Sequence, residues 1–337
     1  MITAPKPHFL QHVTEQSHPG EARRWSVRLA TEFGLDEEDT GRVAIIVTEL
    51  AHNLIKHSGG GELLMRGLAQ DELRGFEVIA LDKGPGMDIA ITMEDGFSTT
   101  GTPGTGLGAI RRQSEQFDIF TAPRQGVAIL ARVWAGRKAP AEKSLQAGAV
   151  CVPVKGEREC GDLWQTIEFG GRFLATVVDG LGHGAEAAEA AEEAVKIFHA
   201  NVAHGPCHIL ERAHDALKKT RGAAMSIVEH SFGKGSMRFA GIGNVSSSLL
   251  ASEKTQSMVS HNGTLGAQIR RCQEFEYPFS QSATLIMHSD GLVSNWDAKL
   301  YRGIGRRDPA LLAALLYRDF SRGRDDVTVL VVREQLA

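Results

Sequence analysis

Four short acidic motifs, each with glycine next to a carboxylate or two residues before it, recur in the second half of the chain. A single Asp-Gly pair is most often a turn, because both residues readily adopt turn conformations. Carboxylates gathered without balancing cations favour a hard divalent cation instead, since Mg²⁺ and Mn²⁺ prefer oxygen ligands. Four such motifs in one block predict a metal site, with ligands drawn from Glu159–Asp162, Val177–Gly184, Met287–Leu292 and Gly323–Val329.

A second set of polar residues stands in the first half of the chain. Glu49, Asn53 and His57 follow one another at intervals of four, which places them on one stripe of a helix. The apolar residues Val43, Ile46, Leu50 and Leu54 form the neighbouring stripe. Taken alone, the polar stripe is as well explained by a solvated helix face as by a binding site.

Two glycine-containing segments further along favour the binding site. Val78–Met87 reads as a strand that ends in Asp82 and is followed by a Gly-Pro-Gly turn. Thr99–Ala109 is a glycine-rich loop that enters a helix. Glycine lets the backbone approach a phosphate closely, and a helix N-terminus supplies free N–H groups and a favourable dipole. A lone glycine-rich loop is weak evidence, but the three segments in this order predict a nucleotide site.

Alternating and helical periodicities place these motifs on regular elements. The first block should contain helices at 21–33, 38–57 and 106–116, and strands at 61–68, 76–82 and 127–134. The second block should contain strands at 149–154, 163–169, 172–178, 223–230, 236–242, 283–288 and 326–332, and helices at 185–203, 208–220 and 309–320. Many strands followed by long helices predict α/β (α+β) sheets covered by helices.

The length of 337 residues predicts two domains. We expect an ATP-binding domain at 1–138, a linker at 139–147, where the composition is small and polar, and a metal-binding domain at 148–337. The formal net charge of -4, with acidic and basic residues interspersed, argues against a nucleic-acid partner. The sequence also lacks a long apolar run, so we expect no membrane association and a cytoplasmic location.

The four cysteines, Cys151, Cys160, Cys207 and Cys272, are scattered through the second block without CxxC spacing. That distribution predicts reduced thiols rather than a disulfide framework or a zinc site. Cys160 reads as a small apolar filler beside the first acidic motif.

Residues 10–135 resemble the GHKL ATPase/kinase family in the ordered motifs ELxxNxxKH, DxGPGM and GTxGxGLGA. The nearest branches are the small bacterial serine kinases of the RsbT and RsbW kind, and Glu94–Thr99 with Phe117-Asp118 favour the RsbT-like branch. This resemblance implies a Bergerat-type α/β sandwich that binds ATP and Mg²⁺. It implies that Glu49 is the general base, that Asn53 holds Mg²⁺ and that Asp82 accepts from adenine. Further ATP contacts fall on Lys56, His57, Gly84, Gly86, Met87, Gly104, Thr105, Gly106, Leu107 and Gly108.

Residues 146–335 resemble the PPM (protein phosphatase 2C-like) family, in its short bacterial branch with RsbX and the sporulation phosphatases. The resemblance implies an α-β-β-α sandwich holding two Mn²⁺ or Mg²⁺ ions. Asp179 would bridge both ions and be central to catalysis, with the Gly180 carbonyl on one of them, and the remaining ligands would be Asp162, Asp290 and Asp325. Asp326 is the alternative to Asp325. His183 would either donate a proton or stabilise its loop, and the latter is favoured.

Together the two resemblances imply a bifunctional protein serine/threonine kinase and phosphatase in a bacterial stress or partner-switching pathway. The expected substrate is a STAS-domain regulator of the stressosome or anti-anti-sigma type. Further candidate partners are a sigma factor, a downstream phosphatase and a second copy in a homodimer. The alternative is an anti-sigma factor, a binding module with an attached phosphatase.

Overall fold

A computed structural model describes residues 5–87, 106–141, 143–251 and 254–334 of the chain. By its internal contacts the chain divides into two compact units. The N-terminal unit consists of His8–Glu142 together with a later segment, Lys299–Leu315. The C-terminal unit holds Lys143–Ala298 and the chain from Leu316 onward. The division falls inside the segment 139–147 that we expected to be the linker, whereas the sequence did not suggest that Lys299–Leu315 groups with the N-terminal unit.

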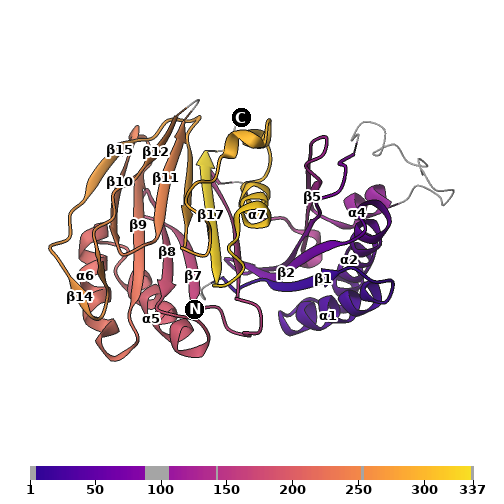
Figure 1. Cartoon of the computed structure of the whole chain (residues 1–337), viewed down its shortest axis with the longest axis horizontal. Helices are drawn as coiled ribbons and strands as arrows, with labels where there is room; N and C mark the ends of the chain where they lie inside the picture. The colour runs from indigo at the N-terminus through magenta and orange to yellow at the C-terminus, as the bar shows by residue number, and fades with distance from the viewer. Residues whose placement is uncertain (1–4, 88–105, 142, 252–253, 335–337) are drawn as a thin grey trace. The chain divides into compact units, whose positions relative to one another are not determined.

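The N-terminal unit is a five-stranded antiparallel sheet with helices on one face (Figure 1). The strand order is β1 (Phe9–Val13), β2 (Gly61–Gln70), β3 (Leu73–Leu81), β5 (Val127–Trp134) and β4 (Gln116–Thr121). The helices are α1 (His18–Glu32), α2 (Glu37–Ser58) and α4 (Gly106–Gln113). Apolar residues of α2 and of alternate sheet positions share one core between the two layers.

Helix α2 is defined at both ends by its sequence. The Asp36 carboxylate accepts a hydrogen bond from the Asp39 N–H, which caps the first turn. Gly59 ends the helix in the left-handed conformation, at φ 72°. The bounded helix carries Val43, Ile46 and Leu50 into the core, so its Glu49–Asn53 stripe is held at the core's edge.

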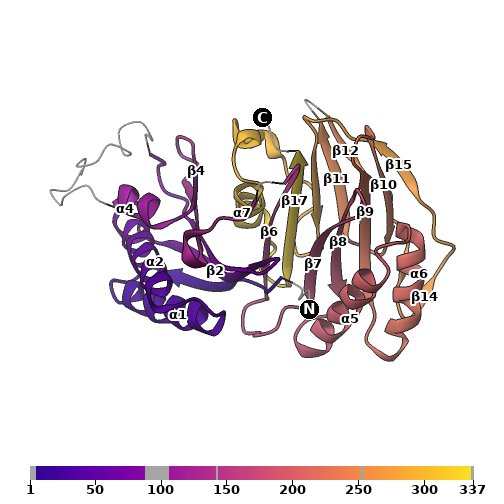
Figure 2. The ribbon, with the colours of Figure 1, turned by 180° about the vertical axis from the view of Figure 1, so that it is seen from behind.

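The C-terminal unit packs two five-stranded antiparallel sheets face to face (Figure 2). One sheet has the order β15 (Phe275–Pro278), β10 (Ser236–Ile242), β9 (Ala223–Ser231), β8 (Arg172–Gly180) and β7 (Asp162–Phe169). The other has the order β12 (Lys254–Ser257), β11 (Ser246–Ala251), β16 (Thr284–His288), β17 (Val327–Glu334) and β6 (Leu145–Val152). A short hairpin, β13 (Gly263–Thr264) with β14 (Gln268–Ile269), completes the strands described.

Helices α5 (Ala185–Ala200) and α6 (Pro206–Ala216) cover the outer face of the β7–β10 sheet. Alanines of α5 face that sheet, and their small side chains let helix and strands approach closely. The opposite face of the same sheet forms the core shared with the second sheet. Because β8 and β9 are buried on both faces, they read in the sequence as continuous apolar runs rather than alternating ones. A third long helix, α7 (Pro309–Phe320), begins within the segment counted with the N-terminal unit.

The α/β fold class expected for both halves is confirmed, and the sequence placed most long elements within a few residues. One boundary needs correction: β6 begins at Leu145, inside the expected linker, because Leu145 pairs with Glu334 and is 2% exposed. The strands that the sequence did not predict are short or of mixed polarity: β1, β4, β11, β12, β13, β14 and β15. None of the described helices is long and apolar enough to cross a membrane.

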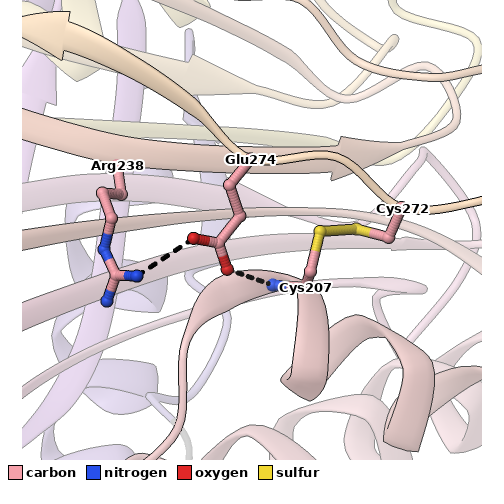
Figure 3. The surroundings of a disulfide bond; sticks show 4 residues. All are labelled: Cys207, Arg238, Cys272 and Glu274. Carbon is pink, nitrogen blue, oxygen red and sulfur yellow. Dashed lines mark hydrogen bonds and ion pairs between the residues drawn. A yellow bond between two sulfur atoms is a disulfide. The ribbon is translucent and has the colours of Figure 1, made fainter.

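The prediction that all four cysteines are reduced is wrong for one pair. Cys207 and Cys272 form a disulfide, with Cα atoms 5.6 Å apart across 65 residues of sequence (Figure 3). Glu274 accepts a hydrogen bond from the Cys207 N–H at 3.0 Å and pairs with Arg238 at 3.0 Å. The bond joins the first turn of α6 to the segment before β15, a proximity that arises only from the tertiary fold. Cys160 is buried in the core between the sheets, as expected of a small apolar filler.

Candidate active sites

The polar stripe of α2 meets the start of α4 in the N-terminal unit. A Cβ placed on Gly106 would lie 3.5 Å from a carboxylate oxygen of Glu49 and 3.6 Å from the side-chain oxygen of Asn53. The first residue of α4 therefore stands beside both side chains that the sequence selected. Helix α4 also turns Leu107 and Ile110 into the core, which fixes its first turn against α2.

Asp82 stands at the end of β3, where the Gly-Pro-Gly turn begins. Its Oδ1 accepts hydrogen bonds from the Gly84 N–H at 2.7 Å and the Val127 N–H at 3.2 Å. Gly126, at φ 70°, passes so close that a Cβ there would lie 2.0 Å from the Asp82 carbonyl oxygen. These contacts hold the carboxylate in one orientation, so the turn is shaped around Asp82.

The other predicted ATP contacts that the structure describes lie in the turn after β3, at the end of α2 and in α4. The Met87 N–H donates to Thr121 Oγ1 at 3.0 Å, and Gly86 adopts φ 81° where a Cβ would lie 2.5 Å from the Ala122 carbonyl oxygen. Lys56 and His57 lie at the end of α2, with their side chains largely exposed. The pKa of His57 is lowered, first by its partial burial and then by the neighbouring Lys56 charge. Gly108 is half-buried in α4. Gly104, Thr105 and the Glu94–Thr99 motif lie outside the described residues.

The predicted metal ligands lie at one end of each sheet in the C-terminal unit. Asp162 begins β7 and pairs in register with Asp179 near the end of β8. Asp290 follows β16 and Asp325 precedes β17, and these two strands are antiparallel neighbours. The two sheets meet here, because Asp290 lies close enough to Asp179 for its charge to raise the pKa of that carboxyl.

Glycines beside the aspartates make the close approach possible. A Cβ on Gly180 would lie 2.2 Å from the Ala187 carbonyl oxygen of α5. A Cβ on Gly161 would lie 2.9 Å from Asp326 Oδ2, and one on Gly291 would lie 1.9 Å from the Asp326 carbonyl oxygen. No other residue type fits at these three positions, so each Asp-Gly motif is more than a turn.

The aspartates perturb one another strongly. Burial foremost, and then the Asp179 charge, raise the pKa of Asp162 well above its usual range. Burial and the neighbouring Asp290 and Asp325 raise the pKa of Asp179 to about 7. Asp162 is 2% exposed, and its Oδ2 has no hydrogen-bond partner. Buried oxygen ligands with uncompensated charge are the donor set that a hard divalent cation needs.

The tandem aspartates before β17 differ in their surroundings. Both oxygens of Asp326 are engaged: Oδ1 accepts from the Val154 N–H at 2.6 Å and Oδ2 from the Gly161 N–H at 2.7 Å. Asp325 is half-buried, and its Oδ1 accepts a hydrogen bond from the Asp326 N–H at 3.0 Å. Asp326 therefore ties the β6–β7 connection to the Asp325 loop.

Three residues around the aspartates were not foreseen as part of the site. Asn244 Nδ2 donates to Asp290 Oδ2 at 2.7 Å, and Ser289 opposes the rise in the pKa of Asp162. Glu157 contacts His183 Nδ1 at 2.9 Å, so His183 is tied to a neighbouring loop. Asn244 ends the Gly241-Ile-Gly-Asn244 segment, and only the fold brings it to Asp290.

Among the residues that the structure describes, no three His, Cys, Asp or Glu side chains are arranged closely enough to hold a metal ion as they stand. The pKa values of Asp162 and Asp179 are raised, and the described aspartates do not form a closed coordination shell. The unpaired Asp162 oxygen and the all-oxygen donor set nevertheless fit a divalent cation.

Comparisons with known proteins find relatives for both halves of the chain. Residues 13–132 match the histidine kinase-like ATPase domain family, and residues 170–335 match the Stage II sporulation protein E (SpoIIE) family. The chain is 35% identical over 114 residues to serine/threonine-protein kinase RsbT of Bacillus subtilis (strain 168), which covers 34% of this chain and 86% of RsbT.

The other half has its own relatives. The chain is 28% identical over 141 residues to phosphoserine phosphatase RsbX of the same organism, covering 41% of this chain and 70% of RsbX. A structure from work on the bacterial stressosome matches with a TM-score of 0.53 and 26% identity, over 57% of this chain and all of that one. The chain thus belongs, through its N-terminal unit, to the RsbT-type family of kinase-like ATPases, and it joins to that unit a SpoIIE-type, PPM-like phosphatase domain.

Proposed function

We propose that this chain both phosphorylates and dephosphorylates serine or threonine on a STAS-domain regulator. The observation that carries the proposal is the presence of two separately assembled sites in one polypeptide. One has Glu49 and Asn53 beside the first glycine of α4, and the other has four aspartates at the meeting ends of two sheets. The stressosome relative, together with RsbT and RsbX, supports a partner-switching substrate.

In the kinase reaction Glu49 would accept the proton of the substrate hydroxyl as it attacks the γ-phosphate of ATP. Asn53, one helical turn further along, would hold the Mg²⁺ that accompanies the nucleotide. Asp82 would accept from the adenine amino group, since its Oδ1 is already held by two backbone N–H groups. Phosphoryl transfer of this kind depends mainly on positioning and charge neutralisation, which these side chains on rigid elements provide.

In the phosphatase reaction Asp162, Asp179, Asp290 and Asp325, with the Gly180 carbonyl, would hold divalent ions. Such ions, when bound, neutralise phosphate charge and lower the pKa of water. The protein's own groups would orient these ligands: Asn244 holds Asp290, and Asp326 ties the loops through two backbone N–H groups. The engagement of both Asp326 oxygens supports Asp325 as the ligand of the tandem pair.

The test uses the full chain with a STAS-domain protein from the same organism. Phosphate transfer from radiolabelled Mg-ATP is measured first, and release of that phosphate is measured after ATP removal and addition of Mn²⁺. Glu49→Gln should lower transfer by about 10²–10⁴-fold, the range for loss of a general base. Asp179→Asn should stop release and leave transfer intact.

The control is Glu38→Gln, which neutralises an exposed glutamate in the first turn of the same helix and should change neither rate. Transfer that survives Glu49→Gln contradicts the kinase assignment. Stoichiometric capture of a sigma factor without transfer to the STAS-domain protein would favour the anti-sigma alternative.

A further inference from the structure

The core between the two sheets of the C-terminal unit becomes polar at the end where the aspartates lie. On β7 and β17 the side chains of Trp164 and Leu330 lie in that core. Because successive side chains of a strand point to opposite faces, Asp162 and Thr328, each two residues away, belong to the same two faces. The core therefore ends in an aspartate on one sheet and a threonine on the other.

Thr328 buries a hydroxyl group that has no hydrogen-bond partner among the described residues. The residue is fully buried, at 0% exposure. Its backbone N–H is already satisfied, since it donates to Ser289 Oγ at 3.0 Å, so strand pairing does not need the hydroxyl. An unpaired buried hydroxyl destabilises a fold, and a valine of similar shape would avoid the penalty. Threonine at this position therefore points to a role other than stability.

Asp162 has the complementary deficiency. It is 2% exposed, and its Oδ2 has no hydrogen-bond partner within the part of the chain that the structure describes. An ionised carboxylate oxygen can only accept a hydrogen bond, whereas the Thr328 hydroxyl can donate one. A single hydrogen bond between the two residues would thus satisfy both buried groups.

Two neighbours that Asp162 and Thr328 share show that the two residues lie close together. Cys151 is the register partner of Thr328 on β6, and its thiol donates to the Asp162 carbonyl at 3.5 Å. Ser289, which follows β16, donates its N–H to the Thr328 carbonyl at 3.0 Å and opposes the rise in the pKa of Asp162. Thr328 is therefore flanked on both sides by residues that also border Asp162.

We propose that Thr328 is a positioning residue for Asp162. In the metal-loaded protein its hydroxyl donates a hydrogen bond to Asp162 Oδ2, which holds the carboxylate in the orientation that a divalent cation requires. Because Asp162 is a metal ligand only under the proposed function, the role of Thr328 rests on that function. The unpaired hydroxyl destabilises the metal-free protein, and the hydrogen bond formed on metal binding removes that penalty.

A structural threonine and a positioning threonine predict opposite results when the hydroxyl is removed. If the hydroxyl stabilised the fold, Thr328→Val would lower the denaturant midpoint of the metal-free protein. A positioning hydroxyl instead affects the metal affinity. Valine then leaves the midpoint in chelator unchanged or raised, because the substitution removes an unpaired buried polar group.

The test combines Mn²⁺ titration calorimetry on the full chain with denaturant unfolding in chelator. Thr328→Val should weaken Mn²⁺ affinity by about 10–100-fold, the usual effect of losing a group that orients a metal ligand. The unfolding midpoint in chelator should not fall. Thr328→Ser, which keeps the hydroxyl and loses only the methyl group, should bind Mn²⁺ with close to the wild-type affinity.

Ser247→Ala is the matched control. Ser247 is 2% exposed, and its Oγ also has no hydrogen-bond partner among the described residues. It lies on β11 opposite Met287, which is paired in turn with Leu330, so it belongs to the core layer just below Thr328. Removing this second buried hydroxyl should leave the Mn²⁺ affinity unchanged.

Three results would overturn the role of Thr328 and leave the proposed function intact. Thr328→Val could bind Mn²⁺ with wild-type affinity, it could lose affinity together with a lower midpoint in chelator, or Ser247→Ala could lose as much affinity. A wild-type chain that does not bind Mn²⁺ would refute the metal site itself, and the role of Thr328 with it. If Thr328→Val does not fold, Thr328→Ser and Thr328→Ala decide, because these two variants differ only by the hydroxyl.

Discussion

The chain contains two groups of buried carboxylates that are treated in opposite ways. In the N-terminal unit Glu77 is surrounded by Arg66 and Arg132, and its pKa is lowered. In the C-terminal unit Asp162 and Asp179 face other aspartates, and their pKa values are raised. Both groups lie on β-strands of antiparallel sheets. Burial alone therefore does not decide the role of a carboxylate. What decides it is whether positively charged side chains of the protein neutralise the carboxylate charge.

The difference separates a structural network from a site. A compensated group satisfies its charge inside the fold, and removing one partner leaves the others unpaired. An uncompensated group stores unfavourable repulsion, which a divalent cation relieves. Substitutions in the compensated group should therefore change the stability of the fold, and substitutions in the uncompensated group should change metal binding and activity.

The largest expected effect comes from the compensated group. Glu77→Gln should lower the free energy of unfolding by about 3–5 kcal/mol, because it leaves two buried arginine charges with less compensation. Denaturant unfolding measures this. Glu62→Gln is the matched control, since Glu62 lies on neighbouring β2 with a pKa raised by burial, and loss of its charge should be nearly neutral. Equal effects from the two substitutions would remove the distinction between the networks.

The uncompensated group should show the reverse pattern. Asp179→Asn should lower phosphatase turnover by at least about a hundredfold, since even outer-shell changes at metal sites reach that size. In the presence of a chelator it should not lower stability, because it removes a charge that repels Asp290 and Asp325. Asp215→Asn, at an exposed position of α6, should change neither quantity. Marked destabilisation of chelated Asp179→Asn protein would contradict this.

The two groups should also respond to pH with opposite sign. The lowered pKa of Glu77 means that its stabilisation is present above its usual pKa of 4.5 and is lost as the pH falls toward the lowered value. Asp179 titrates at about 7 rather than 3.8, so its contribution in chelated protein is fully present below 3.8 and is lost as the pH rises through 7.

Mg²⁺ at a hundredfold excess over its dissociation constant at pH 8 should therefore raise the free energy of unfolding by about 2.7 kcal/mol at that pH. The same Mg²⁺ concentration should raise it less at pH 5, where protons compete for the aspartates. Thermal unfolding with and without chelator measures this. An equal gain at both pH values, or the same gain in Asp179→Asn, would place the binding elsewhere.

Local patterns predicted the aspartates but not what surrounds them. Asp162, Asp179 and Asp290 each stand beside glycine at a strand end, and Asp325 follows Gly323 by two residues. Strand alternation is likewise readable from neighbouring residues. The compensation of Glu77 could not be read, because Arg132 lies 55 residues from Glu77 and nothing near either residue marks the pair. The Cys207–Cys272 disulfide and the short strands β11 and β15 depend equally on contacts distant in sequence.

The smallest expected effect tests whether the unforeseen Asn244 belongs to the site. Its amide donates to Asp290 Oδ2 at 2.7 Å and so fixes a ligand that the other aspartates repel. Asn244→Ala should weaken Mn²⁺ affinity by about 10–100-fold, the usual cost of losing an outer-shell partner, and leave stability in chelator nearly unchanged. Titration calorimetry measures the affinity, with Asn201→Ala as control because the Asn201 amide donates to a helix carbonyl in α5. Unchanged Mn²⁺ affinity would mean that Asn244 only stabilises its own turn, and that the aspartates alone determine metal binding.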